Sequence, residues 1–369
     1  MTFIALQITL FLGALDGTII SPCLPKIGTE FNAASITVWV STAYVLTFDS
    51  FQPIFSKLSD IFGRKWTLVA SVGIFLVGSL LCGVAKTMIM LIISRAIAGI
   101  GAAGVFAGVF TIVSELIPLE KRGSYQGIIN AVFAFASCVG PLIGGLLTDN
   151  ATWRWAFFIN LPIGGIAVLF IIFFFHETIP KASFMSKLKR IDYLGTILIL
   201  ISAILFLLAL NMGGTMYPWK SAPVIAPLVL SLVFIIIFAV VECKYAVEPI
   251  FPPYIFKNQS CVAILLTNFF SGIYFFSVVF YLPNYYQVIK GDSAMWSGIR
   301  LLPFQLVISF FSTLAGILIS KLATFRIFIW SGCFIITLDM GLLSILDVDT
   351  DFALIYGFLI IGSMGKFIF

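Results

Sequence analysis

The sequence has few charged residues and almost no histidine. Only 10% of its 369 residues are charged, whereas 61% are hydrophobic. Soluble domains carry about 25% charged residues, so this chain has too little charge to cover a water-exposed surface. A soluble globular protein is therefore excluded. The single histidine, His176, also leaves too little for a histidine-based catalytic triad or metal cluster.

The cysteines and the net charge also lack the patterns of familiar functional classes. The six cysteines fall mostly within apolar segments and form no CxxC pair, which favours small buried thiols over disulfides or metal ligands. The net charge of +5 is spread over many connections without a long basic run. We therefore expect no nucleic-acid partner and no cofactor, and we do not expect an enzyme.

Long apolar runs dominate the sequence instead. Segments such as 163–175 are continuously apolar, unlike the alternating strands of an outer-membrane barrel, which leaves spanning helices. About 20 apolar residues cross a bilayer core. On this basis the sequence predicts twelve spans, at about 4–24, 36–56, 66–85, 88–113, 125–147, 155–175, 192–212, 222–242, 261–286, 297–320, 325–346 and 353–369. The predicted fold class is an all-α polytopic membrane protein embedded in a lipid bilayer.

The basic residues predict an orientation. If the N-terminus is cytoplasmic, the cytoplasmic connections hold most of the lysines and arginines, while the opposite side holds few and carries Asp347, Asp349 and Asp351. This distribution satisfies the positive-inside rule. We therefore expect a cytoplasmic N-terminus.

A weak internal repeat indicates two related halves. Leu24-Pro25 resembles Leu282-Pro283, and Ser56-Lys57-Leu58 resembles 320–322 at a similar offset. We predict an N-terminal six-helix bundle over 1–175, a cytoplasmic linker over 176–191 and two inserted helices over 192–242. A cytoplasmic loop over 243–260 and an incomplete C-terminal bundle over 261–369 follow.

Several charged residues fall inside the predicted spans. Asp16 is the first candidate for function, because an acid in an apolar helix costs roughly 3 kcal/mol or more to insert. It should face the bundle interior, where burial disfavours its charged form and allows proton exchange. Arg95, a buried cation in the fourth span, is a candidate for function or for a structural counter-ion. Asp49 and Asp339 are either further proton or cation sites or lie closer to water.

The segment from Ser56 to Lys65, S-K-L-S-D-I-F-G-R-K, is the strongest motif. We predict it to be a short cytoplasmic loop between the second and third helices. It resembles the G-x-L-a-D-r-x-G-r-k signature of the major facilitator superfamily, with Ser56 where that family has glycine. The resemblance implies that Asp60, Gly63, Arg64 and Lys65 form a conformational-switch loop.

Three further segments resemble motifs of this family in the same order. The segment from Arg95 to Ala103 resembles its R-x-x-x-G-x-G-a-a pattern, and 139–145 resembles its antiporter pattern G-P-x-x-G-G. The antiporter candidates are Gly140, Pro141, Gly144 and Gly145, where small residues allow close helix packing and proline bends the helix. The segments 15–25 and 153–164 resemble the fourteen-helix drug:proton antiporter branch, found in fungi and bacteria.

This resemblance implies a major facilitator fold of two helical bundles and proton-coupled export of small organic molecules, such as drugs or toxins, by alternating access. It implies that Asp16 and Arg95 couple transport to protons, in a monomer in the plasma membrane. The alternatives are uptake or vacuolar transport of a cationic solute such as a basic amino acid, and a non-transporting membrane receptor or fragment. On the fourteen-helix plan, two closing helices would be missing after Phe369.

Overall fold

The computed structural model describes residues 2–33, 36–175, 177, 192–245, 249–292, 294–322 and 326–366. His176 and most of the predicted 176–191 linker lie outside these ranges. The described residues form α-helices and short 3-10 turns, with a single isolated bridge between Gly213 and Tyr217. The predicted all-α fold class is therefore confirmed. The helices divide into two compact units.

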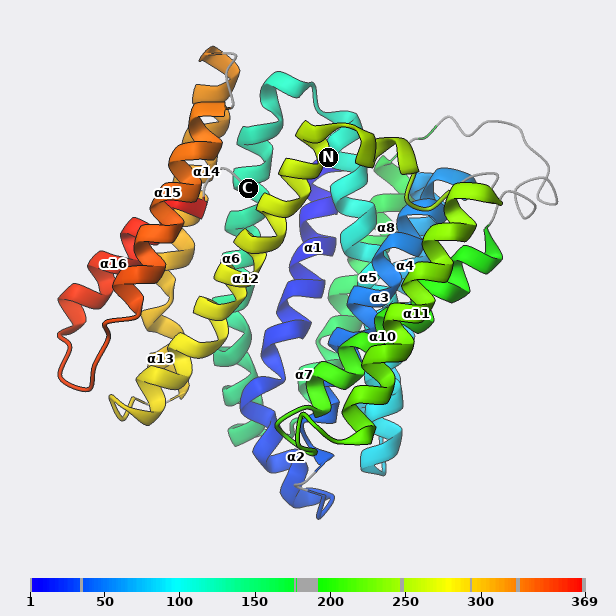
Figure 1. The fold of residues 1–369 in the computed structure, drawn as a ribbon. Helices are drawn as coiled ribbons and strands as arrows, with labels where there is room; N and C mark the ends of the chain where they lie inside the picture. Colours follow the sequence, from blue (N-terminus) through cyan, green and yellow to red (C-terminus); the bar gives the residue numbers. More distant parts are fainter. Residues whose placement is uncertain are drawn as a thin grey trace. The chain divides into compact units, whose positions relative to one another are not determined.

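The first unit comprises Met1–Asp16, Cys23–Ile112 and Leu147–Lys257. It contains most of α1 (Thr2–Ile19), followed by α2 (Leu24–Glu30), α3 (Trp39–Phe62), α4 (Arg64–Gly83), most of α5 (Met88–Leu116), α7 (Trp155–Phe158) and α8 (Asn160–Phe174). Two further helices, α10 (Tyr193–Met212) and α11 (Ala222–Lys244), pack along each other (Figure 1). A buried cluster of Leu12, Tyr44, Phe75, Ala98 and Ala102 joins α1, α3, α4 and α5.

The second unit comprises Gly17–Pro22, Val113–Leu146 and Asn258–Phe369. It contains most of α6 (Leu119–Asn150), then α12 (Gln259–Val288), α13 (Ala294–Arg300), α14 (Leu302–Leu322), α15 (Arg326–Leu343) and α16 (Phe352–Lys366). The last two helices lie side by side (Figure 1). Its core cluster is centred on Tyr274, Tyr286, Phe304, Ile355 and Leu359.

Nine helical segments in the described ranges are long and apolar enough to cross a membrane. On α11, the apolar residues Ile225, Val229, Leu232, Ile236 and Val240 are exposed at helical spacing. A stripe of this kind is unfavourable in water and favourable against lipid tails. The helices α3 and α14 are not among the nine, and α16 is a shorter apolar helix over Phe352–Gly365.

Each predicted span has a helix, but three of the spans are broken. The first is interrupted by the 3-10 turn Ser21–Cys23, the sixth at Ile159 and the tenth at Leu301. Prolines explain all three breaks, because proline lacks an N–H and restricts the residue before it. Pro22 lies within the first break and Pro25 follows it, and Pro162 and Pro303 follow the other two within three residues.

Candidate functional site

The candidate site is built around Asp16, near the end of α1. Its side chain is fully buried within the first unit. One carboxylate oxygen, Oδ2, lies 2.6 Å from Nη1 of Arg95, and the other, Oδ1, accepts a hydrogen bond of 2.8 Å from Asn160 Nδ2. The ionised acid is thus compensated by one cation and one neutral donor.

Arg95 reaches Asp16 from α5, and its side chain is 1% exposed. Its Nε donates to the backbone carbonyl of Val40, at 3.2 Å, on α3. The guanidinium lies 4.1 Å from the ring centre of Tyr44 and 5.7 Å from that of Phe157, so aromatic faces also stabilise its charge. Sequence reasoning singled out both Asp16 and Arg95, but it did not identify them as partners.

Asn160 is a site residue that sequence reasoning missed. It begins α8, is fully buried, and its Nδ2 also lies 3.2 Å from Ser79 Oγ on α4. It thereby links α1, α4 and α8 at one point. The available signal was a polar amide just before the strongly apolar run 163–175, since buried polar groups in a span need partners.

The signature segment differs from its prediction as a loop. The helix α3 continues through Asp60 to Phe62, and α4 begins at Arg64, so Gly63 alone separates them. Gly63 has a φ of 102°, which a residue with a side chain rarely adopts. The apolar face of α3 remains buried as far as Ile61, which explains why the helix extends.

The charged residues of this segment hold the junction together. Asp60 forms an ion pair with Arg64 across Gly63. The backbone N–H groups of Arg64 and Lys65 donate to the Glu177 carboxylate at 2.8 and 2.9 Å, and Lys65 Nζ donates to the carbonyl of Ile172. Glu177 thus caps the positive end of α4. Sequence reasoning missed this acid, although it lies two residues after the end of the sixth apolar segment.

The antiporter motif lies within α6, against the 17–22 segment in the second unit. A β-carbon at Gly140 would overlap the Thr18 hydroxyl, and one at Gly144 would overlap the carbonyl of Ile19. Thus α1 and α6 approach backbone to backbone at these two positions. Gly145 has no neighbour within 4 Å of such an added atom, and Pro141 lies inside the continuous helix.

The two remaining acids differ in their surroundings. Asp49 is exposed on α3. Asp339 is fully buried on α15 in the second unit, where it accepts a hydrogen bond of 2.7 Å from the Tyr274 hydroxyl. Within the described ranges, His, Cys, Asp and Glu side chains form no group of three that would hold a metal ion.

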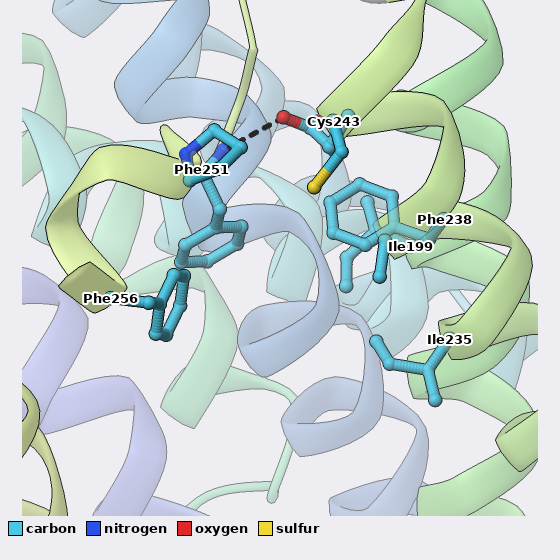
Figure 2. Close-up of a pocket in the computed structure, with 9 residues that line it drawn as sticks. Ile199, Ile235, Phe238, Cys243, Phe251 and Phe256 are labelled. Carbon is cyan, nitrogen blue, oxygen red and sulfur yellow. Dashed lines mark hydrogen bonds between the residues drawn. The ribbon is translucent and has the colours of Figure 1, made fainter.

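An apolar pocket lies in the first unit, and neither Asp16 nor Arg95 lines it. Its volume is about 370 Å³, and Figure 2 shows side chains of α10, α11 and the segment 251–256 around it. The labelled lining residues are Ile199, Ile235, Phe238, Cys243, Phe251 and Phe256. The dashed line is the hydrogen bond from the backbone N–H of Phe251 to Glu242. The pocket offers apolar surface and almost no polar groups.

Known proteins show the same architecture and family. The chain is 37% identical over 366 residues to the efflux pump dotC of Dothistroma septosporum, covering 99% of this chain and 63% of that protein. It is 39% identical over 368 residues to the efflux pump hmp6 of Hypomyces subiculosus, covering 98% of this chain and 65% of that protein. The chain therefore spans less than two thirds of the length of these relatives.

A solved structure agrees at the level of the fold. The human organic anion transporter MFSD10 (TETRAN) matches with a TM-score of 0.66 over 100% of this chain and 83% of that chain, at 14% identity. The family model described as the Major Facilitator Superfamily matches residues 6–369. This is a family of transporters rather than enzymes. The chain is therefore a multi-pass integral membrane protein that belongs to the Major Facilitator Superfamily.

Proposed function

We propose that this chain exports small organic molecules in exchange for protons, by alternating access, and that Asp16 is the acid that carries the proton. The observation that carries this proposal is the buried contact of Asp16 with Arg95 and Asn160. The relatives named as efflux pumps support export as the direction of transport.

Protonation of Asp16 changes the charge balance of this buried cluster. With Asp16 ionised, the pair is neutral overall, and each charge compensates the other. With Asp16 protonated, Arg95 keeps its charge but loses its counter-ion, which is a costly arrangement at low dielectric. The helices that carry these residues, α1 and α5, are then favoured in a conformation in which Arg95 reaches water or an anion. Proton binding is thus coupled to conformation.

The other motif residues fit a transition of this kind. The contacts of Gly140 and Gly144 with Thr18 and Ile19 let α6 pack closely on the segment that directly follows Asp16. The Asp60–Arg64 pair and the Glu177 cap hold α3 and α4 at their junction. We infer that they stabilise one conformation of the transport cycle. We also propose a monomer in the plasma membrane with a cytoplasmic N-terminus, which places this junction in the cytoplasm.

A proteoliposome assay tests the proposal. The protein is reconstituted into liposomes that contain ethidium, a fluorescent aromatic cation. The movement of ethidium across the membrane is recorded with and without an imposed pH gradient. We expect movement that depends on the gradient in the wild type and is lost in Asp16→Asn. Asp349→Asn, an exposed acid after α15, is the matched control and should behave as the wild type. Movement of equal rate without a gradient would contradict proton coupling.

A second cargo separates export from the uptake alternative. Arginine is offered in excess on the side from which ethidium is taken. Unchanged ethidium movement supports export of organic molecules. Competition by arginine, together with its own gradient-driven accumulation, would favour transport of a cationic amino acid.

A further inference from the structure

The second unit contains a buried acid that pairs with no cation among the residues that the structure describes. Asp339 on α15 is fully buried, and Tyr274 on α12 donates to its Oδ2 at 2.7 Å. Its other oxygen, Oδ1, is buried and has no hydrogen-bond partner among the described residues. Asp339 also forms no ion pair with any residue that the structure describes. The arrangement differs from that of Asp16, where both oxygens are satisfied.

Among the side chains that the structure describes on α12 and α16, none supplies a compensating charge for Asp339. Both α12 and α16 pack on α15, and α16 is seen beside α15 in Figure 1. From Phe352 to Gly365, α16 contains no lysine, arginine or histidine. Its titratable residue in that stretch is Tyr356, whose hydroxyl accepts a hydrogen bond of 3.2 Å from Arg300 instead. Tyr274 is therefore the titratable group that faces Asp339.

The pair is also enclosed by a close helix contact. A β-carbon at Gly362 of α16 would overlap both the Tyr274 hydroxyl and Oδ2 of Asp339. The α16 backbone thus lies directly on the two polar groups, and a larger residue would displace them. Any separation of α16 from α15 would admit water to Asp339.

The positions of these residues repeat those of the first unit. Asp16 and Tyr274 are separated by the same number of residues as Leu24 and Leu282. The separation of Ser79 and Asp339 is two residues longer. In the first unit Asn160 bridges Asp16 on α1 and Ser79 on α4, whereas in the second unit Tyr274 on α12 and Asp339 on α15 bond directly. In the first unit the acid lies on α1. In the second unit the acid lies on α15, the helix that corresponds to α4. Arg95 balances the acid of the first unit, whereas no cation among the described residues pairs with Asp339 in the second unit.

We propose that Asp339 and Tyr274 form a second proton-binding site. In the described conformation Asp339 is a neutral carboxylic acid, with the proton on Oδ1 and with Oδ2 accepting the Tyr274 hydroxyl hydrogen. A buried carboxyl without a counter-ion is held neutral because desolvation penalises its charged form. When the helices separate, Oδ1 releases this proton to water, and Tyr274 continues to donate to the carboxylate.

The role of this site in export rests on the proposed function, but its protonation can be measured without transport. The purified full chain in detergent is titrated with alkali, and the C=O stretch of protonated carboxylic acids is followed by infrared difference spectroscopy. We expect Asp339→Asn to remove one carboxylic-acid band and Tyr274→Phe to shift it. Asp349→Asn should leave the band unchanged. An identical spectrum in Asp339→Asn and the wild type would overturn the proposal.

A transport measurement then tests the coupling separately. If two protons are exchanged for each cargo molecule, the Asp339→Asn variant exchanges only one. The greatest ratio of ethidium concentrations across the membrane then falls by about tenfold per unit of imposed pH difference. An unchanged ratio in Asp339→Asn would overturn the coupling role. Asp339→Asn could remove the infrared band while the wild type shows no gradient-driven ethidium movement. That outcome would contradict the proposed function and leave the proton site intact.

Discussion

Asp16 and Arg95 form an ion pair of 2.6 Å in which neither side chain is more than 1% exposed. The two residues lie far apart in the sequence, on α1 and α5, and meet in the interior of the first unit. A buried pair of this kind contributes little net stability compared with apolar residues, but breaking it leaves a buried charge uncompensated. The presence of this ion pair in the interior therefore points to a role in function rather than in folding.

A double-mutant cycle measures the coupling between these two residues. Asp16→Asn and Arg95→Gln should each lower the free energy of unfolding by about 3–5 kcal/mol, because each leaves one charge buried alone. The double variant should lose less unfolding free energy than the sum of the two single losses, since no charge remains unpaired. Thermal unfolding in detergent is the measurement. Strictly additive losses would show that the two groups do not interact.

Asn160 should support the ionised form of Asp16. Asn160→Leu removes the donor to Oδ1 and leaves that oxygen buried without a partner, at a cost of about 1–3 kcal/mol. Ser79→Ala removes only the longer contact of 3.2 Å and should cost less. The same thermal assay ranks the two variants. A larger loss in Ser79→Ala would show that Asn160 acts through Ser79 rather than through Asp16.

The close contact between α1 and α6 should be specific in position. Gly140→Ala and Gly144→Ala both place a β-carbon on α1 atoms, so we expect each to reduce ethidium transport at least several-fold. Gly145→Ala is the matched control, because its added atom meets nothing within 4 Å. Equal transport in all three variants would show that backbone contact at Gly140 and Gly144 is not needed.

Glu177 should stabilise the first turn of α4. Glu177→Gln keeps the shape but removes the charge that faces two backbone N–H groups and the helix dipole, so we expect a loss of about 1 kcal/mol. Hydrogen exchange at the amides of Arg64 and Lys65 reports this directly and should become faster. Protection that does not change would indicate that other groups cap the helix.

The sequence predicted the helical fold and the charged residues, but it did not predict how they pair. Asp16, Arg95 and Asp339 stand out because a charge in an apolar helix is costly wherever it lies. Their partners depend on which helices pack together, and a single sequence contains no direct signal for that. Asn160 was missed because an amide costs less to bury than a charge.

The junction between α3 and α4 shows a different limit. The polar residues from Ser56 to Asp60 are typical of a loop, yet the buried residues Ile54 and Ile61, seven positions apart, lie on one face of α3. Tertiary packing on that face extends the helix to Phe62, against the local preference of its polar residues. Gly63 makes the sharp change of direction after α3 possible, because its φ of 102° is one that residues with a side chain rarely adopt.

Proton release on cargo binding tests the central claim most directly. The purified chain in weakly buffered detergent solution is mixed with ethidium, and a pH indicator dye records the protons that appear. If cargo and proton compete through Asp16, the wild type releases protons and binds ethidium more tightly as the pH rises, whereas Asp16→Asn releases fewer protons and binds with less pH dependence. Ethidium binding with equal affinity at every pH and with no proton release in the wild type would contradict the account.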